Sequence, residues 1–497
     1  AKGLTLDLEA REVPPVALAA YAVELEPGAG EPRGAGAETL CAFRRLSIGP
    51  ADGAGAGGGG TGEPRPGELL AVLRREVSAP SDWFNGEAPP DNLNPDCVDA
   101  FLETTHEAYK KALCDLESGI GGFFYDEPGI HDRHASMTPG RGWVPWSDGF
   151  AAFYRERRGA DFFDTAPLLF FDGEGAPAAR HDYWRTVTER FSEAFTRRIG
   201  DWCRRNGVAS TGHFLWENDL GVATRVCGAI MPNYRYQDMP GIDILGMSDA
   251  EVVTVKQCAS VANQLGKERV ISECYDATGW ELGGDDQKWQ GDWQYALGVT
   301  VRCQHNILYS LRGQGKRDYP PSFGDHNPAM TMLGGIEAYF ARISAALTGG
   351  QAVREILVLH PASTAWARLG TSPRGFAKRG LDRDIPAIRA YGELFNALLR
   401  RLVEEHRDCD LGDEIIMAEE ASVVACSPGK AGNANRPRAL LQVGCAAYKV
   451  IVLPDLGTIL GSTLELLEAF AAAGGAIIAL GHPPSMVEGR PSASVMR

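Results

Sequence analysis

Residues 269–280 read RVISECYDATGW, and this stretch decides the fold that we predict for the chain. The segment from Arg269 to Ser272 is rich in apolar and β-branched residues, which indicates a short buried strand. Tyr275 to Gly279 have the composition of a loop, so Glu273 stands where the strand ends. The sequence therefore predicts a carboxylate at the tip of a strand.

Two upstream stretches repeat this arrangement. In GIGGFFYDEPG, Asp126 and Glu127 follow a predicted strand at 121–125, and in ASTGHFLWEND, Glu217 follows a predicted strand at 210–216. Helical patterns separate the strands, as at 183–204 and 252–265. Strands that each deliver an acid to a loop, with helices between them, are typical of the catalytic face of a (β/α)8 TIM-like barrel.

The alternation of strand and helix is sustained over about 123–310 and shows five units. A closed barrel has eight. We therefore expect an α/β chain with an N-terminally incomplete barrel. Residues 1–80 would hold a partial barrel start with a flexible Gly-rich insertion at 53–62, and residues 81–350 would hold the TIM-like catalytic barrel.

A second alternation begins near Val353 and predicts a separate domain over 351–497, which the end of the chain could truncate. Its segments are REILVLHP, a helix at 385–405, EIIMAEE as a strand, YKVIVLPDLG, a helix at 464–473 and GGAIIALG. Continuous apolar strands indicate a parallel sheet covered on both faces. We expect a flavodoxin-like three-layer α/β domain, and no glycine-rich nucleotide motif supports a nucleotide site.

The amino-acid composition argues against some classes of binding partner and favours one type of cellular compartment. A net charge of −16 and a pI near 5.2 argue against nucleic acid or an anionic membrane as a partner. The longest apolar runs fall short of the roughly 20 residues of a membrane-spanning helix, so we expect a soluble protein. The 11 cysteines are scattered singly, which favours a reducing compartment. We expect a cytoplasmic location, although a leader could have preceded Ala1.

Three glutamates, Glu127, Glu217 and Glu273, fit the chemistry of glycoside hydrolysis. Two carboxyl groups flank the scissile bond in such enzymes, one as proton donor and the other as base or nucleophile. The plainer alternative for each glutamate is a helix cap or a partner for an arginine. Asp126 beside Glu127 either raises the pKa of one of the two acids or points away, towards a cation or a loop.

Several further side chains are candidates to bind a sugar. Trp280 could stack on a pyranose face, and His213 and His305 could hydrogen-bond its hydroxyls, while the alternative for all three is a place in the core. The loop at 308–322 adds Tyr309 and Arg312, whose neighbouring charges could also pair with one another. The predicted substrate-binding residues are Asp126, His213, Trp280, His305, Tyr309 and Arg312.

We expect no cofactor and assign no metal ligands. Calcium stays an option, since hard oxygen ligands are offered by Asp126, Asp219, Asp285 and Asp286, but their spacing is not that of an EF-hand.

The sequence also resembles bacterial glycoside hydrolases related to the family 106 α-L-rhamnosidases. The resemblance rests on the following stretches between about residues 90 and 360: FFYDEPGI, STGHFLWEND, MPNYRYQDMPGIDILG, TVKQCASVANQLGKERVISECYDATGW, DDQKWQGDWQYALGV and CQHNILYSLRGQGKRDYPPSF. It implies a TIM-like barrel acting on a glycoside with Glu127 and Glu273 as the leading pair, Glu217 as a third essential acid and calcium nearby. The β-sandwich modules expected after such a barrel are not seen.

The C-terminal part is similar to the domain that follows the barrel in trimer-forming β-galactosidases. This similarity implies a homo-oligomer formed through the C-terminal domain.

These observations together predict an O-glycosidase acting on an oligosaccharide or glycoside. One alternative is a non-catalytic carbohydrate-binding barrel protein, in which the three glutamates would point to different faces. Another is a metal-dependent hydrolase with Asp126 and His213 as ligands.

Overall fold

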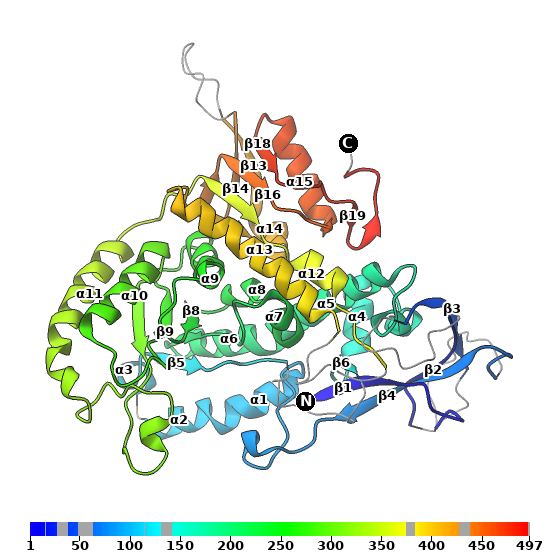
Figure 1. The fold of residues 1–497 in the computed structure, drawn as a ribbon, viewed down its shortest axis with the longest axis horizontal. Helices are drawn as coiled ribbons and strands as arrows, with labels where there is room; N and C mark the ends of the chain where they lie inside the picture. The colour runs from blue at the N-terminus through cyan, green and yellow to red at the C-terminus, as the bar shows by residue number, and fades with distance from the viewer. Residues whose placement is uncertain are drawn as a thin grey trace.

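A computed structural model gives the fold of the chain and describes residues 1–14, 16–26, 38–47, 63–113, 115–130, 142–373, 383–426 and 438–495. Three parts can be followed in the ribbon: an antiparallel sheet in blue, a parallel sheet with its helices in green, and a C-terminal domain in orange and red (Figure 1). The predicted Gly-rich insertion at 53–62 lies outside the described residues. The domain boundaries that we expected at 80 and 350 stay predictions.

The first part is an antiparallel sheet with the strand order β3-β2-β4-β1-β6. Its strands are β1 (Lys2–Asp7), β2 (Ala19–Leu25), β3 (Leu40–Leu46), β4 (Leu69–Val77) and β6 (Trp143–Trp146). Our expectation that residues 1–80 begin the barrel is therefore not met. Polar and charged residues are mixed into β3 and β4, which suits a sheet that keeps one face in water, whereas barrel strands are buried on both faces.

The second part is a parallel sheet with the sequential strand order β5-β7-β8-β9-β10. Its strands are β5 (Gly122–Tyr125), β7 (Ala209–Gly212), β8 (Met239–Ile244), β9 (Ile271–Cys274) and β10 (Val301–Gln304). Each strand pairs with the next strand along the chain that joins this sheet, which is the order of a βα-barrel. Within the described residues β5 and β10 are the two edges, so the sheet forms part of a TIM-like barrel.

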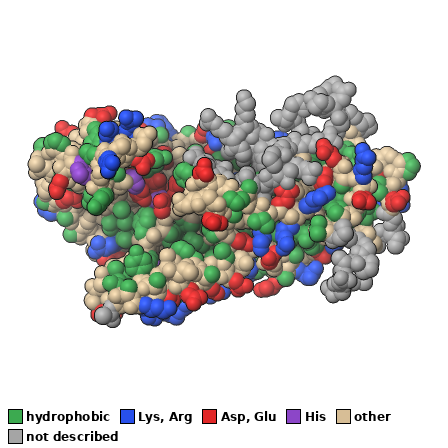
Figure 2. Space-filling view, turned by 90° about the horizontal axis from the view of Figure 1, so that it is seen from below, with side chains coloured by type: hydrophobic (Ala, Val, Ile, Leu, Met, Phe, Trp, Pro, Cys, Tyr) green, Lys and Arg blue, Asp and Glu red, His purple; other side chains and the backbone are tan. Residues whose placement is uncertain are grey.

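Helices alternate with these strands and cover the sheet. They are α1 (Pro95–Thr104), α2 (His106–Ala112), α3 (Leu116–Gly119), α4 (Phe150–Arg158), α5 (Ala176–Phe191), α6 (Arg197–Arg205), α7 (Leu220–Cys227), α8 (Met231–Tyr234), α9 (Val252–Gln264), α10 (Gly284–Leu297) and α11 (Leu333–Thr348). The predicted helix at 183–204 is longer in the structure, because α5 and α6 are joined through a π-helical turn at Ser192–Thr196. The side of this part seen from below is hollowed, and hydrophobic and acidic side chains gather there (Figure 2).

The third part is an α/β domain around a four-stranded parallel sheet with the order β12-β11-β16-β18. The sheet strands are β11 (Ile356–Leu359), β12 (Cys409–Gly412), β16 (Val450–Leu453) and β18 (Ala476–Ala479), and the helices are α12 (Ala362–Arg368), α13 (Ile385–Glu404), α14 (Glu414–Glu420) and α15 (Gly461–Ala472). Numbered within the domain, this order is 2-1-3-4, with which flavodoxin-like sheets begin.

Two small sheets complete this domain. They contain β13 (Ala421–Ala425), β14 (Ala439–Val443) and β15 (Ala446–Tyr448), and β17 (Thr458–Ile459), β19 (Met486–Val487) and β20 (Arg490–Pro491). The prediction of a strand at EIIMAEE is wrong, since these residues form α14 and the strand is the preceding Cys409–Gly412. Short apolar runs do not distinguish a strand from a helix, and Asp413 caps this helix by accepting from the amides of Ile415 and Ile416.

The barrel part and the C-terminal domain share one hydrophobic core, to which α9, α12 and α13 all contribute. Within the described ranges, no helix combines the length and the apolar character needed to cross a lipid bilayer.

Candidate active site

Acidic side chains gather at the edge of the parallel sheet where its strands end. Asp243 and Glu273 are paired residues of β8 and β9, and Glu273 in turn pairs with Cys303 of β10. Residues paired across parallel strands point to the same face, so the two acids share the face of the sheet that a barrel encloses. Asp126 and Glu127 follow the end of the edge strand β5.

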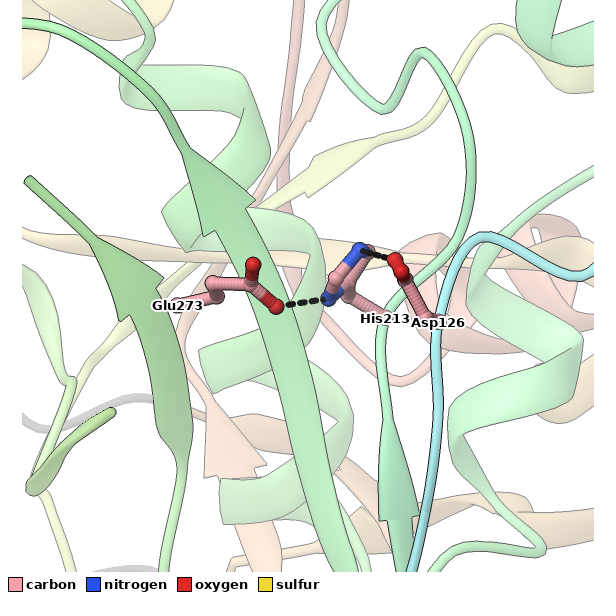
Figure 3. Close-up of side chains that lie close together, drawn as sticks. All are labelled: Asp126, His213 and Glu273. Carbon is pink, nitrogen blue, oxygen red and sulfur yellow. Dashed lines mark ion pairs between the residues drawn. The ribbon is translucent and has the colours of Figure 1, made fainter. Parts of the chain in front are cut away.

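His213 lies at the centre of these acids, directly after β7. Its Nε2 is 3.0 Å from Oδ1 of Asp126 and 4.0 Å from Oδ2 of Asp243, and its Nδ1 is 3.4 Å from Oε2 of Glu273. Figure 3 shows the imidazole between the carboxylates of Asp126 and Glu273. The side chains of His213, Glu273 and Asp243 are 1%, 13% and 14% exposed, so their contacts are largely shielded from water, whereas the Asp126 side chain is 76% exposed.

The carboxylates keep the imidazole charged. Burial alone would lower the pKa of His213, but its contact with Asp126 and the charges of Glu217, Asp243 and Glu273 raise it to about 9. The same contact lowers the pKa of Asp126, so that this pair is ionised at neutral pH. Burial raises the pKa of Glu273, against the lowering effect of His213.

Glu217 reaches the site through a turn rather than from a strand end. The predicted strand at 210–216 is too long, since β7 ends at Gly212 and Trp216 has a φ of 61°. Oε1 of Glu217 accepts hydrogen bonds from the Phe214 amide at 3.2 Å and from the Tyr234 hydroxyl at 3.0 Å. Oε2 accepts from the Asp243 amide at 3.1 Å, so the carboxyl group is fixed from two sides.

Two acids of the site hold a proton more tightly than usual. Burial raises the pKa of Glu217 to about 7, although His213 and the three hydrogen bonds oppose this shift. Burial also raises the pKa of Asp243 to about 8, with Glu217 and Glu273 adding to the shift and His213 opposing it. Neighbouring carboxyl groups with separated pKa values are the arrangement from which enzymes take a proton donor and a base.

A pocket of about 370 Å³ opens beside the acids. Its lining includes three of them, Glu127, Glu217 and Asp243, and the aromatic side chains Trp83, Trp216 and Tyr319. A carboxylate oxygen of Glu127, a nitrogen of His213 and a carboxylate oxygen of Asp243 lie within 4.8 Å of one another. Glu127 is exposed, so its carboxyl group can reach a molecule in the pocket.

Backbone strain is concentrated around this pocket. Glu127, Trp216, Tyr275 and Tyr319 have positive φ values of 44°, 61°, 74° and 50°. A non-glycine residue held in this region costs about 1–3 kcal/mol, and such residues cluster at functional sites. The loops that carry the acids are therefore held in conformations that an unconstrained loop would avoid.

The structure brings the three predicted glutamates to one site, together with Asp126, His213 and His305. The His305 nitrogens are 3.9 Å from Glu273 and 3.2 Å from Asp276. Contact with Asp276 raises the pKa of His305.

Three predicted sugar-binding residues lie apart from the acids. The Trp280 indole N–H donates to the Lys316 carbonyl at 2.8 Å, and Trp280 is not among the residues that line the pocket. Tyr309 is fully exposed at 102%, and Arg312 is exposed on the same loop. The ring that this loop brings to the pocket is that of Tyr319 instead.

Asp243, Asp276 and Tyr319 were not among the predicted site residues. Asp243 carried a signal, because it is the single acid in the apolar run GIDIL and precedes the last residue of its strand, as Glu273 does in ISEC. Trp83 had no signal, since it stands in a polar loop far from the barrel strands in sequence. Tyr319 lies in the loop at 308–322, from which Tyr309 and Arg312 were chosen instead.

Two groups of side chains are close enough to hold a metal ion: Asp126 with His213 and Glu273, and Glu127 with His213 and Asp243. Both groups depend on a nitrogen of His213, whereas calcium prefers six to eight oxygen ligands. The groups therefore do not fit calcium and suit a zinc-like ion better.

The other predicted calcium ligands do not join Asp126. Asp219 caps α7 and pairs with Arg389, and Asp285 and Asp286 lie in the first turn of α10.

No protein-family model matches the chain, and neither does any curated protein. Solved structures do match. The rhamnosidase from Novosphingobium sp. PP1Y matches with a TM-score of 0.59 and 17% identity, over 85% of this chain and 38% of that chain. The β-galactosidase from Marinomonas ef1 matches with a TM-score of 0.52 and 10% identity, over 83% of this chain and 64% of that chain.

A cold-adapted β-galactosidase from Rahnella sp. R3 matches with a TM-score of 0.50 and 13% identity, over 79% of this chain and 55% of that chain. The chain spans less than two thirds of each of these three structures. At such identities the likeness shows the fold alone. The chain shares with these three structures its fold, part of a TIM-like barrel with a second α/β domain.

Proposed function

We propose that the protein is a glycoside hydrolase that cleaves O-glycosidic bonds with a pair of carboxyl groups. The observation that carries this proposal is the convergence of acids from successive barrel units around His213. Glu127, Glu217 and Asp243 line one pocket, and Glu273 contacts His213 beside it. A pocket of about 370 Å³ is within the size range of small-molecule sites. Glycoside hydrolysis needs an acid in each of two protonation states, and the site offers both.

Glu127 or Glu217 is the proton donor in this proposal. Glu217 has a pKa of about 7 and so keeps a proton into the neutral range, and Glu127 stands exposed at the pocket. The donor protonates the glycosidic oxygen as the bond to C1 breaks. Glu273 either removes a proton from the water that attacks C1 or attacks C1 itself, in which case water releases the sugar in a second step.

The first substrate to test is an α-L-rhamnoside. Support for this choice comes from the resemblance of the DEP and SEC stretches to rhamnosidases and from the match to a solved rhamnosidase at a TM-score of 0.59. β-Galactosides are the second class to test, since two of the matching structures are β-galactosidases.

The test is a panel of aryl glycosides, followed by the variants Glu127→Gln, Glu217→Gln and Glu273→Gln. We expect Glu273→Gln to lower kcat by about three orders of magnitude or more, while the melting temperature stays within a few degrees. Glu268→Gln is the matched control, because Glu268 is exposed on the preceding loop and pairs only with Arg269. Near-normal hydrolysis by Glu273→Gln would refute the assignment.

A non-catalytic carbohydrate-binding barrel is the alternative from another class. In such a protein the three glutamates would point to different faces of the barrel. Glu127 and Glu217 line the same pocket, which argues against this alternative. Sugar binding without turnover of any glycoside in the panel would favour it.

A metal-dependent hydrolase is the second alternative, favoured by the grouping of Asp126, His213 and Glu273 within 4.8 Å. The metal and a proton would compete for the same His213 nitrogens. Metal analysis of the purified protein, followed by chelation and return of Zn²⁺, distinguishes the two mechanisms. Activity that is lost on chelation and restored by Zn²⁺ would replace the two-carboxylate proposal.

A further inference from the structure

Glu251 lines the same pocket as the acids but has no place in the mechanism above. It is the last residue of the loop between β8 and α9 and is half-buried. Its side chain does not cap α9, because it accepts no hydrogen bond from the backbone amides of the first turn. Its hydrogen bond is to the Thr254 hydroxyl, which lies 3.4 Å from Oε2.

No cation of the described chain compensates the charge of Glu251. Its carboxylate has no salt bridge to a described Lys, Arg or His, and the described lining of the pocket contains no basic side chain. Burial raises the pKa of this carboxyl group, as expected for an acid that has lost water without gaining a charged partner. A ligand hydroxyl that donates to Glu251 would give this carboxylate a further hydrogen-bond partner beside Thr254.

The rest of the lining suits the ring of a sugar. Trp83, Trp216 and Tyr319 line the pocket and are 59%, 37% and 49% exposed. Leu245 adds an apolar contact close to Glu251 in sequence. Aromatic faces hold the apolar side of a pyranose, and a carboxylate beside them can accept hydrogen bonds from two adjacent hydroxyls.

We propose that Glu251 is a specificity-determining residue that accepts hydrogen bonds from hydroxyl groups of the bound sugar. The inference rests on the proposed function for the site but concerns recognition rather than bond cleavage.

The kinetic test compares Glu251→Gln with Asp249→Asn on the best aryl glycoside of the panel. We expect Glu251→Gln to raise KM about tenfold or more with kcat within a fewfold of the parent, since a charged hydrogen bond to substrate is lost. Asp249 is the matched control, because it lies in the same loop, is exposed and pairs with Arg400. An unchanged KM for Glu251→Gln would overturn the inference.

A binding test separates this inference from the proposed function, because it needs no turnover. Saturation-transfer NMR would measure the binding of methyl α-L-rhamnoside and methyl β-D-galactoside to the intact chain and to its Glu251→Gln variant. We expect binding of at least one of the two glycosides and weaker binding by Glu251→Gln. Binding without turnover would contradict the hydrolase and leave this inference standing, whereas equal binding by Glu251→Gln, or binding of neither glycoside, would overturn it.

Discussion

The backbone amide of Asp243 donates to Oε2 of Glu217 at 3.1 Å, so a strand of the sheet holds the acid that the previous unit delivers. A main-chain donor cannot be removed by a side-chain substitution, and its position depends on the pairing of β8 with β9. The geometry of Glu217 is thereby tied to the sheet, although its own backbone lies in a loop.

Burial raises the pKa of Glu217, and the hydrogen bond from the Tyr234 hydroxyl opposes this shift. The hydroxyl donates to Oε1 at 3.0 Å and thereby favours the ionised carboxylate. We expect Tyr234→Phe to raise the pKa of Glu217 and to move the alkaline limb of the kcat/KM profile upward by about 0.5–1 pH unit, if Glu217 is the proton donor. Tyr236→Phe is the control, since Tyr236 has no hydrogen bond to Glu217, and an alkaline limb that moves downward would contradict the assignment.

His213 lowers the pKa of Glu273 through its positive charge. In His213→Gln this charge is absent, so the pKa of Glu273 rises. As the pH falls, Glu273 then becomes protonated at a higher pH than in the parent protein. We expect the acidic limb of the kcat profile to move upward by about one to two pH units. His482→Gln, at a histidine that is 96% exposed, should leave the profile unchanged, and an acidic limb that stays in place in His213→Gln would show that Glu273 does not act as the base.

Glu414 is a buried acid of the C-terminal domain whose pKa burial raises to about 7 from an ordinary value of 4.5. The folded state binds the Glu414 proton more tightly than the unfolded state does. The stability that protonated Glu414 contributes is therefore fully present below pH 4.5 and is lost as the pH rises through 7. We expect Glu414→Gln, which can still accept from the Leu460 amide, to be the more stable protein at pH 8, by about 3 kcal/mol. Denaturant unfolding at pH 5 and pH 8 measures this, and an equal difference at both pH values would refute it.

Arg354 forms ion pairs with two aspartates in the interface between the barrel and the C-terminal domain. Its Nη1 is 2.8 Å from Oδ1 of Asp410, which is completely buried, and its Nε is 2.8 Å from Asp408, which also pairs with Lys256 of α9. Arg354→Met leaves Asp410 without its cation, and we expect a loss of about 3–5 kcal/mol in the free energy of unfolding.

The control for this prediction is Arg401→Met, at an exposed residue of α13 that pairs with Glu405, where we expect a loss below about 1 kcal/mol. Both proteins are compared by denaturant unfolding. Equal losses would mean that the Arg354 contacts add no stability to the interface.

The sequence predicted the barrel well where strands are short, apolar and followed by loop residues. The strands that end near Tyr125 and Cys274 and the helix at 252–264 were found within one or two residues. Because parallel strands end at one edge, the meeting of Asp126, Glu127 and Glu273 could be expected before any coordinates.

The sequence could not predict features that depend on contacts distant along the chain. The antiparallel pairing of Lys2–Asp7 with Trp143–Trp146 joins segments about 140 residues apart, and no local pattern encodes such a pairing. The central place of His213 likewise arises from three separate strand ends, and its sequence neighbours do not reveal it. Trp280 was predicted to stack on sugar; its indole N–H donates to the Lys316 carbonyl, and the stacking role stays a prediction.

Trp83 gives the pocket a wall that the barrel itself does not supply. It lies in a short turn, Asp82–Phe84, directly after the antiparallel sheet, while the acids of the pocket lie on the parallel strands or on the loops that follow them. Exchange of the first ninety residues for those of a related chain would therefore reshape one side of the pocket and leave its acids in place.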